Sequence, residues 1–385
     1  MTTAAQQPIS VRRLRHDPNR QPFIVIWEVT RACQLACVHC RASAIQHRDP
    51  LELSTKQGGS LLADIASFPR PHPIVVLTGG DPLERPDLID LVSCGTEHGL
   101  SMALSPSVTP RLTREALGEL TDAGIKAVSI SVDGASAATH DAFRQVPGVF
   151  DATMRALTDV RDAGARLQIN TTVTADTIDE LPRILAIALA ARASLWSVFF
   201  LVPTGRGTRL RPLSPTDEED VLHWLYDAAQ YIAIKTTEAP QYRRIAIQRA
   251  QGAPPVIGEL GSRLRALTAE ILGDPGTIRP RRPPIDVNSG RGFVFIDHRG
   301  TVYPSGFMPV AVGSVHQQPL TDIYRDAPLL RQLRTPAEFH GKCGVCEFRD
   351  VCGGSRSRAY AASGDALGED PSCVYVPPRT TDAPR

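Results

Sequence analysis

The sequence predicts an α/β protein whose core is a parallel β-sheet. Two observations lead to this class: short apolar runs rich in branched residues recur along the N-terminal half, and a helical pattern follows each run. The segments LSTKQGGSLLADIASF and TREALGELTDAG, for example, combine helical spacing with Ser or Thr caps and closing glycines. Strands that alternate with helices in this way favour parallel pairing, with the helices as crossovers. The six strand candidates are residues 23–29, 74–77, 100–105, 127–132, 167–173 and 195–202.

Composition and charge indicate an ordinary soluble protein. Of the 385 residues, 42% are hydrophobic and 22% are charged, and the formal net charge is +1. That balance gives no global field for nucleic acid or acidic membranes, so neither is expected as a partner. No apolar stretch reaches the ~20 residues of a membrane span, and the N-terminus lacks the apolar core of a secretory signal. We therefore expect a cytoplasmic protein, in which cysteines serve metal or redox chemistry rather than disulfides.

Residues 27–43, WEVTRACQLACVHCRAS, carry three of the eight cysteines directly after the first strand candidate: Cys33, Cys37 and Cys40. Three thiolates on one loop can hold three corners of a cubane iron–sulfur cluster and leave the fourth iron open to another ligand. Structural zinc usually takes four ligands from paired C-x2-4-C units, so a lone C-x3-C-x2-C fits zinc poorly. Buried thiols or a redox pair would explain three such closely spaced cysteines less well. His39, inside the loop, is interpreted as a packing residue.

The C-x3-C-x2-C spacing after a strand resembles the signature of the radical S-adenosylmethionine (SAM) superfamily. In that family the amino and carboxylate groups of SAM occupy the open iron. The resemblance implies a partial (β/α)6 barrel, since six strand–helix units are too few for an eight-stranded one. It also implies that the reduced [4Fe–4S] cluster cleaves SAM to a 5′-deoxyadenosyl radical, with an electron donor such as flavodoxin or ferredoxin.

The second strand candidate ends in LTGGDPLERPDL, and the carboxyl ends of barrel strands carry the active site. Gly79 and Gly80 allow the backbone to approach a ligand closely, and Asp81 adds a carboxylate. The resemblance implies that this segment binds the SAM ammonium, with aspartate in place of the glutamate of the family's Gly-Gly-Glu-Pro motif. Taken alone, Gly-Gly-Asp-Pro is an ordinary turn; its place at a strand end after the cysteine loop favours the SAM role.

Two further strand ends supply candidate SAM contacts. The fourth strand ends in SISVDG, and the resemblance implies that Ser131 meets the SAM ribose and that Arg144, in the following loop, meets its carboxylate. Asn170 lies in LQINTTVT, the fifth strand, as a polar residue in an otherwise apolar run. Two interpretations of Asn170 stay open, a buried amide that bridges strands and a supporting residue near SAM.

A second cysteine group, C-x2-C-x5-C-x20-C, lies near the C-terminus: Cys343, Cys346, Cys352 and Cys373. Four thiolates complete a cubane with no open iron, or form a tetrahedral zinc site. After a radical SAM core, this group resembles the auxiliary-cluster extension called the SPASM or twitch domain. The fuller pattern needs a further cysteine upstream, where this chain has Ser305 in YPSGF. We therefore expect one auxiliary [4Fe–4S] cluster.

The predicted organisation runs in five parts. These are a flexible arm at 1–20, a radical SAM partial barrel at 21–235, a connecting region at 236–290, a SPASM/twitch-like domain at 291–376 and a tail at 377–385.

The C-terminal pattern is most similar to the branch of the superfamily that holds tetrapyrrole-modifying enzymes of heme biosynthesis, beside maturases of ribosomally made peptides. The expected activity is therefore oxidative modification of a small-molecule or peptide substrate, with a tetrapyrrole side chain favoured over a peptide. A non-catalytic iron–sulfur electron-transfer protein is the alternative from another class, and a zinc-bearing peptide-binding scaffold is a third. Three arginines after the sixth strand offer either a carboxylate site or a solvated loop: Arg206, Arg209 and Arg211.

Overall fold

The structure is a computed structural model that describes residues 11–273 and 279–378. Its strands are β1 (Ile24–Thr30), β2 (Ile74–Gly79), β3 (Ser101–Leu104), β4 (Ile125–Ser131), β5 (Arg166–Val173), β6 (Leu195–Phe200), β7 (Ile234–Thr237), β8 (Phe293–Ile296), β9 (Thr301–Tyr303) and β10 (Gly313–Ser314). The helices of the N-terminal part are α1 (Thr55–Ala66), α2 (Leu88–Glu97), α3 (Arg114–Asp122), α4 (Ala137–Arg144), α5 (Val149–Asp162), α6 (Leu181–Ala190), α7 (Pro215–Ala228), α8 (Gln241–Ala250) and α9 (Glu259–Leu272). Those of the C-terminal part are α10 (Leu320–Asp326), α11 (Pro328–Leu333), α12 (Gly341–Val345) and α13 (Arg356–Ser363). Single 3-10 turns are η1 (Pro82–Glu84), η2 (Ile178–Glu180), η3 (Gly205–Arg209) and η4 (Pro336–Glu338).

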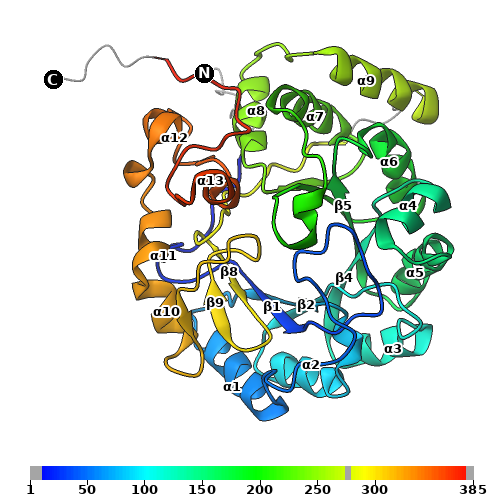
Figure 1. Ribbon diagram of the computed structural model, residues 1–385, viewed down its shortest axis with the longest axis vertical. Helices are drawn as coiled ribbons and strands as arrows, with labels where there is room; N and C mark the ends of the chain where they lie inside the picture. The colour runs from blue at the N-terminus through cyan, green and yellow to red at the C-terminus, as the bar shows by residue number, and fades with distance from the viewer. Residues whose placement is uncertain (1–10, 274–278, 379–385) are drawn as a thin grey trace, which may run out of the picture.

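One curved sheet organises the described chain, in the order β10-β9-β8-β1-β2-β3-β4-β5-β6-β7. Every pair from β8 through β1 to β7 is parallel, and β9 and β10 continue the edge in antiparallel fashion. Figure 1 shows the strands around an open centre and the helices α1 to α9 on the outside of the curve. The six predicted strands are confirmed as β1–β6, and the partial barrel is confirmed with them.

Local signals explain where the helices begin. Ser54 caps α1 and forms a reciprocal capping box with Gln57, so the predicted Ser and Thr caps are confirmed there and at Thr113 of α3. Ser214 caps α7 by accepting from the Asp217 N–H at 3.1 Å, and its hydroxyl donates to the Asp217 carboxylate at 2.7 Å. The buried residues of α1–α6 face the sheet, and they build one apolar core with the outward-facing strand residues.

The sequence analysis missed β7. Its last strand candidate ends at residue 202, whereas in the structure α7 ends at Ala228 and a further strand follows it. Ile232 and Ile234 are both buried, the alternation of a strand, and β7 pairs in parallel with the free edge of β6. The strand β7 depends on its pairing with β6, and local residue spacing does not reveal that pairing.

The C-terminal part is joined to the barrel through the sheet. β8 and β9 form an antiparallel hairpin that turns at residues 297–300, and β8 pairs in parallel with β1. The predicted connecting region contains α8 and α9, and its boundary at 235/236 falls inside β7. The five-part division itself stays a prediction.

The predicted N-terminal arm is only partly described, because residues 1–10 lie outside the described residues, as does most of the predicted tail, 379–385. Within residues 11–20, Nε of Arg12 donates to the Pro283 carbonyl at 3.0 Å and the Leu14 N–H donates to Asp286 at 2.9 Å. Across the described ranges, none of the helices combines the length and apolarity that a membrane span requires.

Candidate active site

The cysteine loop follows β1, at the carboxyl end of the parallel strands. Cys33 and Cys37 are buried and Cys40 is half-buried. Each sulfur accepts a hydrogen bond, as follows: Cys33 from the Leu35 N–H at 3.4 Å, Cys40 from the Ala44 N–H at 3.4 Å, and Cys37 from Nη1 of Arg144 at 3.6 Å. Donors aimed at sulfur favour thiolates and tune cluster potentials, so this set of residues fits three corners of a cubane.

His39 and Phe143 pack together beneath the loop, with ring centroids 4.5 Å apart. Burial lowers the pKa of His39 to about 4, so the imidazole is neutral at physiological pH. His39 therefore packs against Phe143, and its predicted packing against the cluster or the adenine stays a prediction.

Arg206 fastens the loop after β6 to the cysteine loop. Its N–H donates to the Cys40 carbonyl at 3.0 Å and its Nε donates to the Cys37 carbonyl at 2.9 Å. The sequence analysis gave Arg206 as a candidate for binding a substrate carboxylate. In the structure its donors are hydrogen-bonded to the backbone carbonyls of Cys37 and Cys40. Arg211 pairs instead with the exposed Asp176.

Gly79 and Gly80 are required by the chain's own packing. A Cβ on Gly79 would lie 2.1 Å from the Thr30 carbonyl oxygen, and one on Gly80 would lie 2.3 Å from that of Ala32. Gly79 also has φ of +150°, which L side chains rarely adopt. The close approach lets the Gly80 N–H reach the Thr30 carbonyl at 2.9 Å, so the glycines hold the β2 end against the start of the cysteine loop.

Asp81 is fully buried beside this contact. Its carboxylate accepts from Oγ1 of Thr109 at 2.7 Å, from the Leu83 N–H at 3.2 Å and from the Ser107 N–H at 3.4 Å. Burial raises the pKa of Asp81 to about 6 in the absence of a cation. A ligand ammonium next to this carboxylate would lower it again, and the SAM role of Asp81 stays a prediction.

Ser107 and Thr109 were missed by the sequence analysis. Ser107 lies 3.5 Å from the sulfur of Cys33 and donates to the Gly80 carbonyl at 2.8 Å, so it joins the cysteine loop to the glycine turn. The sequence did carry a signal for them. The segment SPSVTP follows β3 and the glycine turn ends β2, so both lie at the same end of the sheet.

Arg144 lies between the barrel mouth and the cysteine loop. Its Nη2 donates to the fully buried carboxylate of Asp133, which also accepts from the Thr172 N–H at 2.6 Å. Although burial alone would lower the pKa of Arg144, the Asp133 carboxylate and Cys37 raise it overall. The structure therefore brings Arg144 to the cluster loop as expected, and its contact with the SAM carboxylate stays a prediction.

Ser131 and Asn170 are neighbours in the sheet. Ser131 is paired with Asn170 across β4 and β5, and Asn170 is paired with Ser197 across β5 and β6. The Asn170 amide oxygen accepts from Nε2 of Gln168 at 2.7 Å. The structure therefore gives Asn170 a partner on its own strand, and a supporting role near SAM stays open.

The four C-terminal cysteines come together around α12 and the loop before α13. All four accept or approach backbone or guanidinium donors, among them the N–H of Asp370 and Nη2 of Arg356, each 3.5 Å from Cys343. Burial raises the pKa of Cys352 to about 12, and the neighbouring thiols Cys373 and Cys343 contribute. By residue type, four thiols with N–H donors nearby are the ligands of either a cubane or a zinc ion. Within the described ranges, no trio of His, Cys, Asp or Glu side chains is arranged to hold a single ion.

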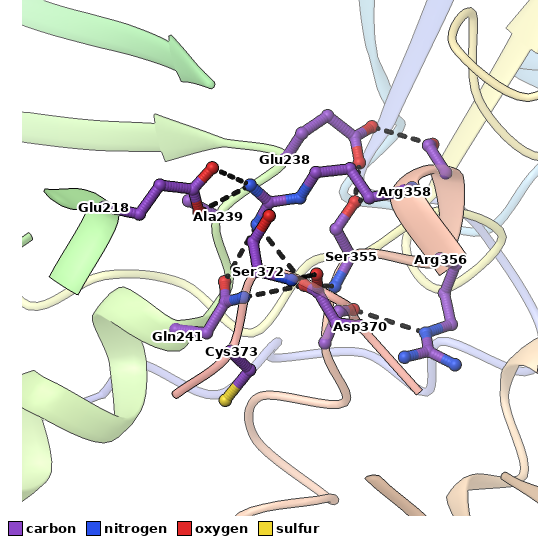
Figure 2. Close-up of polar contacts among 12 residues, drawn as sticks. Glu218, Glu238, Ala239, Gln241, Ser355, Arg356, Arg358, Asp370, Ser372 and Cys373 are labelled. Atoms are coloured by element: carbon purple, nitrogen blue, oxygen red, sulfur yellow. Dashed lines mark hydrogen bonds and ion pairs between the residues drawn. The ribbon is translucent and has the colours of Figure 1, made fainter. Parts of the chain in front are cut away.

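A buried polar network joins α13 and Asp370 to the barrel helices α7 and α8 (Figure 2). Arg358 of α13 donates to Glu218 of α7 and to Asp370, and Gln241 of α8 donates to Asp370 at 2.7 Å. The backbone N–H of Asp370 also donates to Cys343. Asp370 therefore connects the barrel helices, through its carboxylate, to a cysteine sulfur, through its N–H.

A second carboxylate, Glu238, follows β7 and belongs to the same region (Figure 2). It accepts hydroxyl donors from Ser355 at 2.5 Å, Ser357 at 3.0 Å and Ser305 at 3.1 Å. Ser305, which stands where a further cysteine was sought, is thus fully buried and hydrogen-bonded to the barrel edge.

The interior of the barrel holds a cavity of about 320 Å³. Its walls come from the first residues of β1–β6, from β7 and from the segment 282–289. The apolar lining includes Ile24, Val76, Phe293 and Phe307. Six basic side chains line it, and Glu238 is the single acidic one among the described lining residues; the basic set is Arg12, Lys126, Arg166, Lys235, Arg243 and Arg282.

Comparisons with known proteins agree with this geometry. The model of the radical SAM superfamily matches residues 27–187. The chain is 39% identical over 358 residues to the AdoMet-dependent heme synthase of Methanosarcina barkeri, covering 92% of this chain and 97% of that protein. It is 40% identical over 363 residues to the AdoMet-dependent heme synthase of Nitratidesulfovibrio vulgaris, covering 93% and 94%.

A more distant relative, the mycofactocin maturase of Mycobacterium ulcerans, is 31% identical and covers 97% of this chain and 93% of that protein. Among solved structures, SuiB of Streptococcus suis bound to S-adenosylmethionine has the same fold, with a TM-score of 0.67 at 13% identity over 92% of this chain and 78% of that one. The likeness to known proteins thus extends along almost the whole chain. The chain belongs to the radical SAM superfamily, and it is an enzyme that uses a [4Fe–4S] cluster and S-adenosylmethionine.

Proposed function

We propose that this enzyme oxidatively decarboxylates propionate side chains of a tetrapyrrole, a step of heme-type biosynthesis. The observation that carries the proposal is the interior cavity, whose apolar walls suit a macrocycle and whose basic side chains suit its carboxylates. The likeness to two heme synthases at 39% and 40% identity supports the same substrate class.

The N-terminal site would be held by Cys33, Cys37 and Cys40, with SAM against the glycine turn, Ser131 and Arg144. When bound, this pair supplies a primary carbon radical able to take a hydrogen atom from an unactivated carbon. The chain's own residues position that chemistry: the glycines fix the turn, Arg206 fixes the loop, and the Asp133–Arg144 pair places a guanidinium at Cys37.

The overall change on each side chain balances simply. A propionate, R–CH2–CH2–COO⁻, loses one hydrogen atom from the carbon next to the ring, one electron and CO2, and becomes a vinyl group, R–CH=CH2. The hydrogen atom would pass to the adenosyl carbon that SAM supplies, and one electron from the external donor would complete the conversion of SAM to 5′-deoxyadenosine and methionine. The one electron that the side chain gives up needs an acceptor that takes electrons singly.

We assign that acceptor role to a second [4Fe–4S] cluster held by Cys343, Cys346, Cys352 and Cys373 in a SPASM/twitch-like module. The Asp370 network supports this role, because it links Cys343 to the barrel edge. The choice of iron–sulfur over zinc rests on the resemblance to the auxiliary-cluster extension. An external donor such as flavodoxin or ferredoxin would supply reducing electrons. A reducing, cytoplasmic compartment suits the eight cysteines, none of which forms a disulfide.

The test is turnover by the anaerobically reconstituted protein with SAM, a flavodoxin reducing system and Fe-coproporphyrin III, a porphyrin with four propionates. Mass spectrometry should show products that have lost CO2 and two hydrogens from one or two side chains, with one 5′-deoxyadenosine for each loss. Cys33→Ala should give neither product. Formation of 5′-deoxyadenosine with the porphyrin unchanged would refute the proposed substrate while leaving the family assignment intact.

A peptide substrate is the second candidate. The likeness to a mycofactocin maturase at 31% identity favours it, because that protein's name assigns it to maturation of mycofactocin. A peptide with a C-terminal carboxylate would lose CO2 by the same balance. The two candidates are separated by supplying each substrate class in the same turnover assay.

A further inference from the structure

We propose that Lys235 is the residue that binds a substrate carboxylate inside the barrel. The inference rests on the proposed function and names one side chain for one interaction. Lys235 belongs to β7, the strand that the sequence pattern concealed, and it lines the interior cavity.

The sheet register places Lys235 in the same row as the candidate SAM contacts. Ser131 is paired with Asn170, Asn170 with Ser197, and Ser197 with Lys235, across β4 to β7. Neighbouring strands lie about 4.8 Å apart, so the Lys235 backbone stands about 10 Å along the sheet from that of Asn170.

Lys235 lacks a counter-ion in the part of the chain that the structure describes. No carboxylate there lies within ion-pair distance, and no acceptor is hydrogen-bonded to its ammonium. Burial lowers the pKa of Lys235, and no neighbouring charge opposes this effect. A desolvated ammonium is costly without a partner, and an anionic ligand would supply one.

Ser197, the neighbour of Lys235 in this row of the sheet, also lacks a hydrogen-bond partner within the described chain. The Ser197 hydroxyl is fully buried and finds no hydrogen-bond partner among the described residues. Trp196, the adjacent residue of β6, is satisfied by Oγ1 of Thr171 at 2.9 Å, so the deficit is specific to the inward-facing side of the strand. Ser197 is not among the described residues that line the cavity, so Lys235 is the donor of this pair that a cavity ligand would meet.

The other basic side chains of the cavity are less suited to this role. Arg243 already donates to the carbonyls of Val351 and Val287, and Arg12 donates to that of Pro283. The remaining three are exposed at the rim: Lys126, Arg166 and Arg282. None of the six forms an ion pair with a described carboxylate, so together they keep the cavity positive for a ligand with several carboxylates, and Lys235 is the interior cation with free donors.

The single acidic lining residue does not neutralise Lys235. Glu238 is bound by the hydroxyls of Ser305, Ser355 and Ser357, and burial raises its pKa. It therefore adds little negative charge to the cavity.

The experiment measures porphyrin binding by absorbance titration of the anaerobic, cluster-loaded protein. The probes are Fe-coproporphyrin III and its tetramethyl ester, which has the same ring without charged carboxylates. The variants are Lys235→Met and Lys235→Arg, with Lys56→Met, an exposed lysine of α1, as the matched control.

Lys235→Met should weaken binding of the tetracarboxylate by about 10-fold to 100-fold, the range expected for a buried charge-assisted hydrogen bond. Binding of the ester should stay within a few-fold of wild type. Lys235→Arg should recover much of the loss, and Lys56→Met should match wild type. Iron content measured on each variant verifies that it has folded.

Unchanged tetracarboxylate binding by Lys235→Met would overturn the inference, and so would an equal loss for acid and ester, which would mean a packing role. If the wild type binds the tetracarboxylate through Lys235 but never converts it, the proposed function fails and the inference stands. If the wild type binds neither porphyrin, both are refuted.

Discussion

Arg358 donates from one guanidinium nitrogen to both carboxylate oxygens of Glu218, at 2.5 and 2.6 Å, and so joins α13 of the C-terminal part to α7 of the barrel. Both side chains are only 4% exposed. Asp370, which Arg358 also contacts, donates its N–H to Cys343. The Glu218–Arg358 pair therefore stabilises both the barrel edge and the second cysteine site.

Replacing Arg358 with Met is expected to destabilise the protein by about 3–5 kcal/mol, because it leaves Glu218 buried without its partner. Anaerobic urea unfolding measures the change. The double variant Glu218→Gln/Arg358→Met removes the stranded charge and should recover part of the loss. Equal stability of wild type and Arg358→Met would show that the network contributes little.

Stability should also depend on pH through Glu218. Burial raises the pKa of Glu218 to about 7 despite the opposing effect of Arg358, whereas its unperturbed value is 4.5. A raised carboxyl pKa means that the folded state binds the proton more tightly, so this contribution is present below about pH 4.5 and is lost as pH rises through about 7. The slope in this window reaches at most about 1.4 kcal/mol per pH unit. Urea unfolding at several pH values should show a shallower slope for Glu218→Gln; identical slopes would contradict the assignment.

Gly80→Ala should be severely damaging. The new Cβ would lie 2.3 Å and 2.6 Å from the carbonyl oxygens of Ala32 and Arg31, which are backbone atoms of the cysteine loop and cannot swing aside. Loss of iron from the N-terminal site and loss of 5′-deoxyadenosine formation are expected. Gly118→Ala is the matched control, since nothing lies within 4 Å of a Cβ there and alanine favours helix α3 by about 1 kcal/mol. Full activity of Gly80→Ala would rule out a strict steric requirement.

The two cysteine groups should be separable by metal analysis. Wild type should contain about eight irons, and Cys33→Ala and Cys343→Ala should each lose about four. Cys343→Ala should still cleave SAM to 5′-deoxyadenosine without completing substrate oxidation, whereas Cys33→Ala should do neither. Four irons and one zinc in the wild type would instead mean that the C-terminal site is structural.

Much of the barrel was readable from local patterns. The alternating strands of β1–β6 and the capped helices depend on residue periodicity and on side chains a few positions apart, so the sequence predicted them correctly. The spacing of the cysteines likewise depends only on neighbouring residues. β7 was hidden because its strand state depends on pairing with β6, and the helical pattern before it was stronger.

The candidate site shows the same division. Sequence alone determined which residue types are available at each strand end: the thiols, the glycine turn with Asp81, and Ser131, Arg144 and Asn170. Only the tertiary structure decided their partners, because the contacts join residues far apart in the chain. Thr109 meets Asp81 across 28 residues, Cys37 meets Arg144 across 107, and Glu218 meets Arg358 across 140. Lys235 is the extreme case: nothing near it in the sequence marks it as a site residue, and only the pairing of β7 with β6 places it as a half-buried cation that lines the cavity.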